Sequence, residues 1–160
     1  MKVSRSLMAG LLVVAAAVSA SAQTATQTVT IQVDAINQVS VAGTPSLTIS
    51  AAVAGGAPTT VTSTGATWAV TTNQTGAKIT ASIGSAMPTG VTLSANLGAP
   101  AAATSAGLQA LSTSAVDVVT GITKLNATGL SLSYQLDATS AAGTVASTTR
   151  VVTFTITGGA

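Results

Sequence analysis

The 160-residue sequence contains no cysteine, no histidine and no glutamate. Without cysteine, an extracellular fold must hold together without disulfides. Without histidine and cysteine, the Ser-His-Asp and Cys-His nucleophile systems and the usual zinc ligand sets are excluded. Acid–base chemistry would depend on Asp34, Asp117 and Asp137 alone, and no flanking residue predicts a perturbed pKa for them. We therefore expect a protein that is not an enzyme, with no catalytic, cofactor-binding or metal-binding residues.

Aromatic side chains are equally scarce, with one tryptophan, one tyrosine and one phenylalanine. Carbohydrate-binding surfaces usually present several aromatic rings, so no small-molecule ligand is expected. Trp68, Tyr134 and Phe154 each alternate with aliphatic residues at a spacing of two. This spacing places each ring on the same strand face as its aliphatic neighbours, and it predicts that all three are core anchors.

The first 22 residues have the pattern of a cleaved signal peptide. Lys2 and Arg5 precede an apolar run, Leu7–Val18, that is too short to span a bilayer as a helix. Small residues follow at Ala20–Ala22, and cleavage there predicts a mature chain that begins at Gln23. We expect the protein to be secreted or on the cell surface, or periplasmic in a diderm bacterium, with no membrane span after signal removal.

Charge is scarce in the rest of the chain. The net charge of +2 and the pI of about 9.5 depend on the two basic residues of the signal segment. Residues 23–160 retain three basic and three acidic side chains. With no basic patch to neutralise phosphates, binding to nucleic acid is not expected. A net charge near zero favours association between copies.

What the chain has in abundance is alternation of apolar residues with Thr and Ser, in short segments separated by Gly, Ala, Ser and Pro. A period of two buries one face of a strand, and a Thr/Ser face opposite is typical of antiparallel sheets. We expect an all-β fold over residues 23–160, a single antiparallel β-sandwich that is immunoglobulin-like or related, preceded by the cleaved signal helix. Strands are expected near residues 29–33, 38–42, 47–49, 68–70, 79–83, 91–97, 116–122, 130–136 and 152–156, and loops at 51–60 and 97–107.

Residues 23–35 form a predicted N-terminal arm, with Val29, Ile31 and Val33 on one face. Asn37 interrupts the odd-numbered apolar series and Ile36 falls out of phase, which predicts a bulge or kink at 35–37. The arm could pair within its own domain as an ordinary first strand. It could instead complete the sheet of a neighbouring molecule by strand addition.

Two stretches, DVVTGITKLNATGLSLSYQLDATSAAGTVASTTRVVTFTIT and AINQVSVAGTPSLTI, resemble parts of small uncharacterised secreted bacterial β-sandwich proteins. The chain is also similar to fimbrial subunits in its signal peptide, its alternating N-terminal arm and its Thr-rich strands. It differs from the chaperone–usher pattern because it has no cysteine pair and ends in RVVTFTIT, which has the pattern of a complete strand. The resemblance implies a structural role and transfers no catalytic motif.

These features favour a secreted structural or cell-surface protein, a fibre or matrix subunit that associates with itself through the arm. The alternative is a monomeric extracellular binding module. It could be adhesin-like, with contacts made by loops. It could also be ice-binding, with Thr153, Thr155 and Thr157 on one strand face and Thr28 and Thr30 on another.

Overall fold

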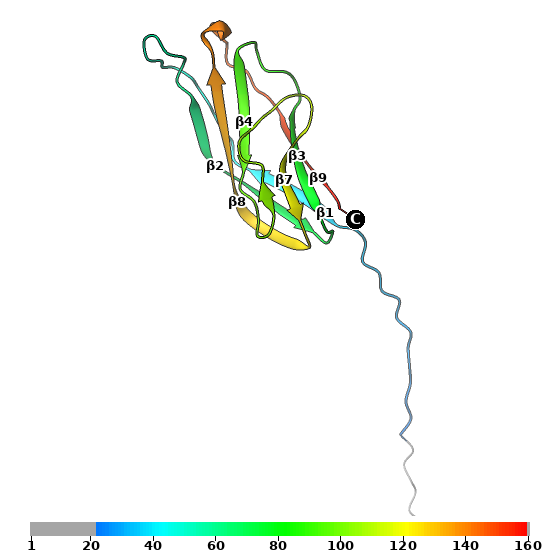
Figure 1. The fold of residues 1–160 in the computed structure, drawn as a ribbon. Coiled ribbons are helices and arrows are strands. Elements are labelled where there is room, and N and C mark those ends of the chain that lie inside the picture. Colours follow the sequence, from blue (N-terminus) through cyan, green and yellow to red (C-terminus); the bar gives the residue numbers. More distant parts are fainter. Residues whose placement is uncertain (1–21, 160) are drawn as a thin grey trace, which may run out of the picture. The chain divides into compact units, whose positions relative to one another are not determined.

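The structure, a computed structural model, describes residues 22–159, so the signal segment expected at residues 1–22 lies outside the described residues apart from Ala22. The chain divides into two units, residues 1–32 and residues 33–160. The described part of the first unit forms neither helix nor strand. The described part of the second unit is built from strands, with a single 3-10 turn, η1 (Ser140–Ala142), and no α-helix (Figure 1). The prediction of an all-β chain is confirmed.

The strands of the second unit form two antiparallel sheets. One has five strands in the order β1-β2-β8-β4-β6, and the other has four in the order β5-β7-β3-β9. Every ladder between neighbouring strands is antiparallel. The strands are β1 (Asn37–Ala42), β2 (Val61–Thr72), β3 (Ala77–Ile83), β4 (Val91–Leu97), β5 (Thr104–Ser105), β6 (Gln109–Ala110), β7 (Val116–Ile122), β8 (Leu125–Ala138) and β9 (Val152–Thr157).

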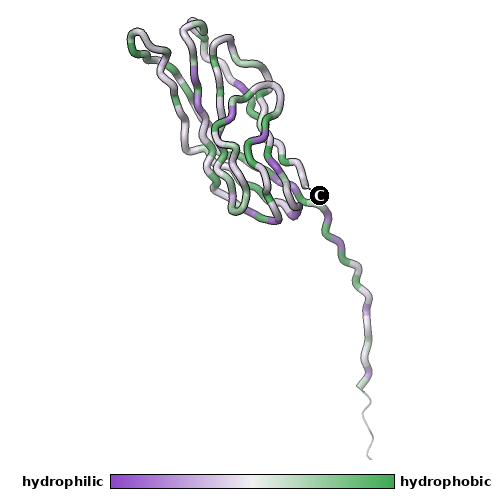
Figure 2. Tube along the Cα trace, in the orientation of Figure 1, coloured by the Kyte–Doolittle hydropathy of each residue, from purple (hydrophilic) through white to green (hydrophobic). Residues whose placement is uncertain are grey.

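The alternating pattern produces one hydrophobic core shared by both sheets. Apolar and polar residues alternate along the strands (Figure 2), and the burial of β3 follows the same period of two. The largest fully buried side chains come from both sheets: Trp68, Leu97, Ile79, Val118, Val119 and Ile122. Trp68 is only 1% exposed, which makes it the largest apolar group in this core.

Two glycines in the long β2–β8 ladder mark places where its register shifts. Gly65 (φ 95°) lies in the shift between Ser63 and Ala66, and Gly129 (φ 66°) lies in β8 opposite the second shift. Glycine adopts a positive φ without a steric penalty, so each glycine accommodates an extra residue without ending its strand. The ladder thereby reaches 12 residues in β2 and 14 in β8.

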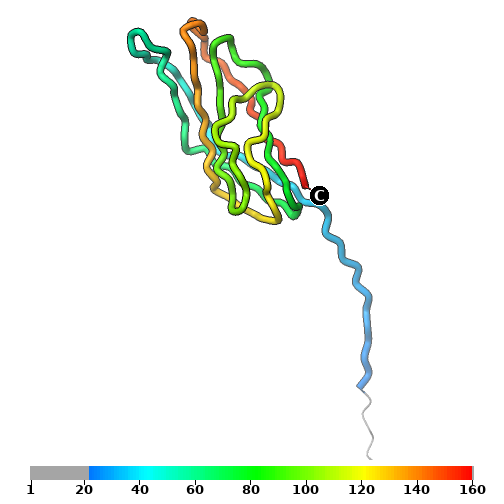
Figure 3. Tube along the Cα trace, viewed as in Figure 1, coloured from blue at the N-terminus to red at the C-terminus, as the bar shows by residue number. Residues whose placement is uncertain are grey.

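The strand expected at residues 47–49 is wrong. Residues 43–60 contain no strand, only an isolated bridge between Ala52 and Pro58. Figure 3 traces the path of this segment, coloured cyan to blue-green, which turns back on itself at one end of the domain. The chain leaves β1 at Gly43 (φ 106°), where an added Cβ would lie 3.0 Å from the Ala66 Cα. Pro45 follows and has no N–H to donate to a ladder. Leu47 still packs against the core from this irregular segment, so its apolar character reports packing and not a strand.

Candidate assembly edge

Each sheet has two edges, and the edges differ in length. Two edges are formed by β5 and β6, which have two residues each. The other two are formed by β1 and β9, which have six residues each. An unpaired edge presents a row of backbone N–H and C=O groups to any strand that approaches, so the longer edges offer the larger templates.

The short edges belong to the segment between β4 and β7, which we call the closing segment (residues 98–115). Ser105 Oγ donates a hydrogen bond of 2.6 Å to the Leu97 carbonyl and accepts one of 3.0 Å from the Gly107 N–H. The Leu111 N–H donates to the Leu93 carbonyl, and the Leu111 side chain is buried. The closing segment is thus tied to β4 and packed into the core.

The long edges, β1 and β9, carry apolar residues that the domain covers only in part. Val39 on β1 is half-buried, and Val41 is 50% exposed. On β9, half-buried Val152, Phe154 and Ile156 alternate with exposed threonines. A small cavity of about 80 Å³ is lined by β1 and β9 together: Val39, Ser40, Val41, Val152 and Phe154. We call β1, β9 and this cavity the open side of the domain.

The predicted arm residues lie outside every strand. Val29, Ile31 and Val33 are 71%, 89% and 81% exposed. No strand is assigned in residues 22–36, so within the described residues the structure does not form the strand expected at 29–33. Three apolar side chains at a spacing of two therefore face solvent.

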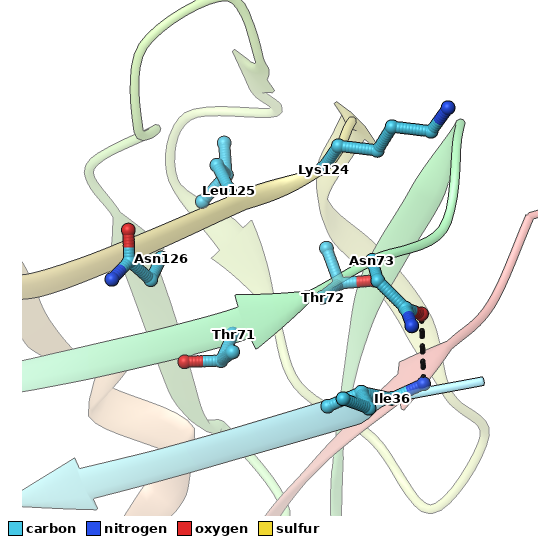
Figure 4. A pocket seen from close by; sticks show the side chains of 7 residues that line it. All are labelled: Ile36, Thr71, Thr72, Asn73, Lys124, Leu125 and Asn126. Carbon is cyan, nitrogen blue, oxygen red and sulfur yellow. Dashed lines mark hydrogen bonds between the residues drawn. The ribbon is translucent and has the colours of Figure 1, made fainter. Parts of the chain in front are cut away.

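The base of the arm is fixed by one asparagine. Asn73 Oδ1 accepts a 2.8 Å hydrogen bond from the Ile36 N–H (Figure 4). Asn73 Nδ2 donates one of 2.7 Å to the Asp34 carbonyl. The Asn73 N–H also donates to the Ile36 carbonyl. Thr72 Oγ1 donates to Asn37 Oδ1, which explains why a polar residue occupies an inward position of β1. The phase break in the sequence therefore marks the boundary between the arm and the sheet.

A shallow pocket of about 360 Å³ adjoins this base. It is lined by Ile36, Thr71, Thr72, Asn73, Lys124, Leu125 and Asn126 (Figure 4). Its one ionisable side chain, Lys124, points away from the other labelled residues. The lining therefore supplies a positive charge at its rim and no carboxylate, thiol or imidazole for catalysis.

Asp117 and Asp137 have structural partners in the described chain. Asp117 pairs with Lys78 at 2.9 Å, with both side chains nearly half exposed. Asp137 accepts hydrogen bonds from Thr60 and Gln135, and these bonds hold the pKa of its carboxyl group below its usual range. Among residues 22–159, no group of three or more His, Cys, Asp or Glu residues lies close enough to hold a metal ion.

The three predicted core anchors occupy different depths. Trp68 is buried on β2, and its Nε1 donates a 3.1 Å hydrogen bond to the Gly98 carbonyl. Tyr134 is 7% exposed on β8, and burial raises the pKa of its hydroxyl. Phe154 is only half-buried, because β9 is an edge strand and its ring lines the cavity of the open side.

Sequence reasoning did not identify the open side of the domain. It predicted Phe154 as a core anchor, and the half-buried ring does pack against the core. It did not identify β1 and β9 as neighbours that line one cavity. The alternating residues of both strands were visible in the sequence, but alternation does not show which strands lie at an edge. The role of Asn73 was also missed, since its partners Asp34 and Ile36 lie more than 30 residues away in the chain.

The described part of the chain contains no helix that is long and apolar enough to cross a membrane. Comparisons of the chain with protein-family models, with curated proteins and with solved structures give no match.

Proposed function

We propose that this protein is an exported structural subunit of the cell exterior, without enzymatic activity, which assembles into a fibre or matrix by strand addition. One observation carries the proposal: an exposed arm with a one-sided apolar pattern precedes a domain whose open side has two six-residue edges. Strand addition obtains its affinity from main-chain hydrogen bonds and its specificity from pockets for alternate side chains. The arm supplies the alternate side chains, and the open side supplies unpaired backbone and a cavity.

The strand order supports a sandwich related to the immunoglobulin fold. In that fold, strands A, B, E and D form one sheet, and C, F and G form the other. The order β1-β2-β8-β4 corresponds to A-B-E-D, and β3 beside β9 corresponds to C beside F. The position that G would take is the outer edge of β9, which lies close to β1 but is hydrogen-bonded to no strand of the described residues. This correspondence makes the edge of β9 a natural place for an added strand.

Export and a role outside the cell are supported by the sequence. The signal pattern at residues 1–22 predicts secretion. Residues 23–160 contain only three Lys or Arg residues, so trypsin-like proteases would find few sites. The carboxylates of Asp117 and Asp137 serve structural contacts, which supports a role without acid–base catalysis.

The test is the assembly state of the exported protein. Intact-mass analysis of culture supernatant should give the chain without residues 1–22. Sedimentation velocity at increasing concentration should show growing species, and negative-stain microscopy should show fibres or a matrix. A variant without residues 23–34 should remain a folded monomer at every concentration. A concentration-independent monomer for the intact protein would contradict the proposal.

A second candidate function is an ice-binding module, and one observation favours it. Thr153, Thr155 and Thr157 are all exposed on one face of β9, and Thr155 pairs with Thr80 on β3. Thr28 and Thr30 lie outside any strand, so the described structure supplies one regular threonine row. Thermal hysteresis of the purified monomer, abolished by Thr155→Lys, would support this candidate over a structural subunit.

A further inference from the structure

We infer that the arm of one copy pairs antiparallel with β9 of a second copy, with Ile31 opposite Phe154. This inference rests on the proposed function and adds the acceptor strand, the direction and the register. In this register, Val29 lies opposite Ile156 and Val33 lies opposite Val152. The acceptor is thus the outer edge of β9 and not the outer edge of β1.

The number of inward apolar residues favours β9 over β1. The arm has three exposed apolar residues at a spacing of two. β9 also has three apolar residues at this spacing, and those three are half-buried. On β1, the inward positions are Asn37, Val39 and Val41, and Asn37 is polar and bonded to Thr72. An arm on β1 would place one apolar side chain against an amide, whereas an arm on β9 meets an apolar partner at each position.

The outward residues fit the same register. Thr30 would lie opposite Thr155, and Thr28 would lie opposite Thr157, so threonines meet across the new ladder. Thr–Thr pairs directly opposite each other stabilise antiparallel strands. The threonines of β9 are exposed on this face.

Charge favours the antiparallel direction. Antiparallel pairing places Asp34 of the donor opposite Val151 of the acceptor, next to Arg150. The Arg150 guanidinium donates to three uncharged oxygens, those of Ala86, Thr148 and Thr149, so its positive charge can still attract a carboxylate. A parallel arm would instead place Asp34 opposite Thr157.

The cation on the neighbouring strand at that parallel position is already engaged. Lys78 is the β3 residue paired with Thr157, and its ammonium forms an ion pair with Asp117. The parallel direction therefore offers Asp34 a lysine that already has a carboxylate partner, whereas the antiparallel direction offers it Arg150.

The position of the arm base makes this pairing head-to-tail. The base leaves the domain beside the start of β1, and β9 ends at the same place, with Gly158 against Asn37 (Figure 1). An antiparallel arm enters the acceptor at Val152, which is the opposite end of β9. The arm end of one domain therefore meets the far end of the next, and the same contact can repeat along a fibre. A parallel arm would bring two arm ends together.

The absence of cysteine allows a direct test by disulfide trapping in the exported full-length mature protein. The reporter is a double variant, Thr30→Cys with Thr155→Cys. Directly opposite residues in an antiparallel pair have Cα atoms about 4.5–5.5 Å apart, which is within the range of a disulfide. Two matched double variants report the alternatives: Thr30→Cys with Ser40→Cys for an arm on β1, and Gln32→Cys with Thr155→Cys for a parallel arm on β9.

Under mild oxidation, the reporter should give a ladder of dimers, trimers and longer species on a non-reducing gel, which collapses when a reductant is added. Its cross-linked yield should exceed that of either matched variant by about tenfold, because the alternative pairs lie outside disulfide range. A ladder from either matched variant in place of the reporter would overturn the inference and leave the proposed function intact. An intramolecular disulfide in a monomer would overturn it as well, because the arm would then occupy β9 of its own copy.

Sedimentation of the same samples distinguishes a wrong acceptor strand or register from a wrong proposed function. Assembly without a reporter ladder would overturn the acceptor and register but not the function. A reporter that remains monomeric, alongside an unsubstituted protein that also remains monomeric, would overturn both.

Discussion

The two sides of this domain differ in how well their sheet edges are protected from pairing with other chains. On one side, the sheet edges are two residues long, and the closing segment ties them to the core through Ser105 and Leu111. On the other side, β1 and β9 expose six-residue edges and half-covered apolar residues. Natural sheet proteins usually shorten, cover or charge their edges to prevent pairing with other chains. The same small domain thus has one protected side and one unprotected side, and the proposed strand addition depends on this difference.

The largest effect on the protected side should come from Trp68. Trp68→Ala removes the largest core side chain and the hydrogen bond to Gly98, the first residue of the closing segment. We expect a loss of about 3–5 kcal/mol in the free energy of unfolding, measured by urea denaturation followed by circular dichroism. Trp68→Phe keeps most of the buried ring and should lose less. An unchanged urea midpoint for Trp68→Ala would show that the ring is not part of the core.

A smaller but more selective effect is expected from Leu111. Leu111→Ala should cost about 2–5 kcal/mol, because this buried side chain anchors the closing segment over the edge. The weakened segment should also expose that edge, so the variant should aggregate at concentrations that leave the parent protein soluble. Leu108→Ala is the matched control, since Leu108 lies in the same segment but is 46% exposed. Equal losses for the two variants would contradict the anchoring role of Leu111.

On the open side, Ile31→Asp should separate assembly from folding. The side chain is 89% exposed, so the unfolding free energy of the monomer should stay within about 0.5 kcal/mol of the parent value. Assembly should weaken by about 2 kcal/mol or more, because the contact would bury an unpaired charge. Gln32→Asp places the same charge on the other face of the arm and should disturb assembly less. Sedimentation velocity measures the assembly of both variants. Equal assembly by Ile31→Asp and the parent would show that Ile31 is not part of the contact.

The smallest effect is expected away from both sides, at Thr60. The folded-state pKa of Asp137 lies below its unfolded value, so this carboxylate adds stability that is present above pH of about 4 and is lost as pH falls through the folded pKa. Thr60→Val removes the first of its two hydrogen bonds and should cost well under about 1 kcal/mol at pH 7, because the group is largely solvated.

Thermal unfolding at pH 7 and at pH 3 measures this effect, and the cost of Thr60→Val should shrink at the lower pH. Thr59→Val is the control, because the Thr59 backbone N–H bonds to the Ala51 carbonyl and valine keeps that bond. A cost that grows as the pH falls would show that the carboxylate of Asp137 is not stabilised by Thr60.

The sequence predicted well those features that depend on local pattern. Alternation correctly indicated an all-β chain and located β3, β4 and β7, and β1 begins at the polar Asn37 that interrupts the apolar series. The expected strand at 47–49 failed because one or two apolar residues beside Pro45 pack equally well from an irregular loop. The open side could not be predicted from local pattern. The position of β9 depends on its pairing with β3, which lies about 70 residues earlier in the chain.

The two-residue strands β5 and β6 have a consequence for the architecture of any assembly. A building block with one donor arm and one acceptor edge has a valence of two, and such units polymerise into unbranched lines. Had the closing segment left its side open, each unit would have offered further contacts, and branching would have produced an amorphous gel. In the proposed assembly, the hydroxyl of Ser105 and the side chain of Leu111 would thereby determine whether the material is linear or branched, although neither residue would touch a neighbouring molecule.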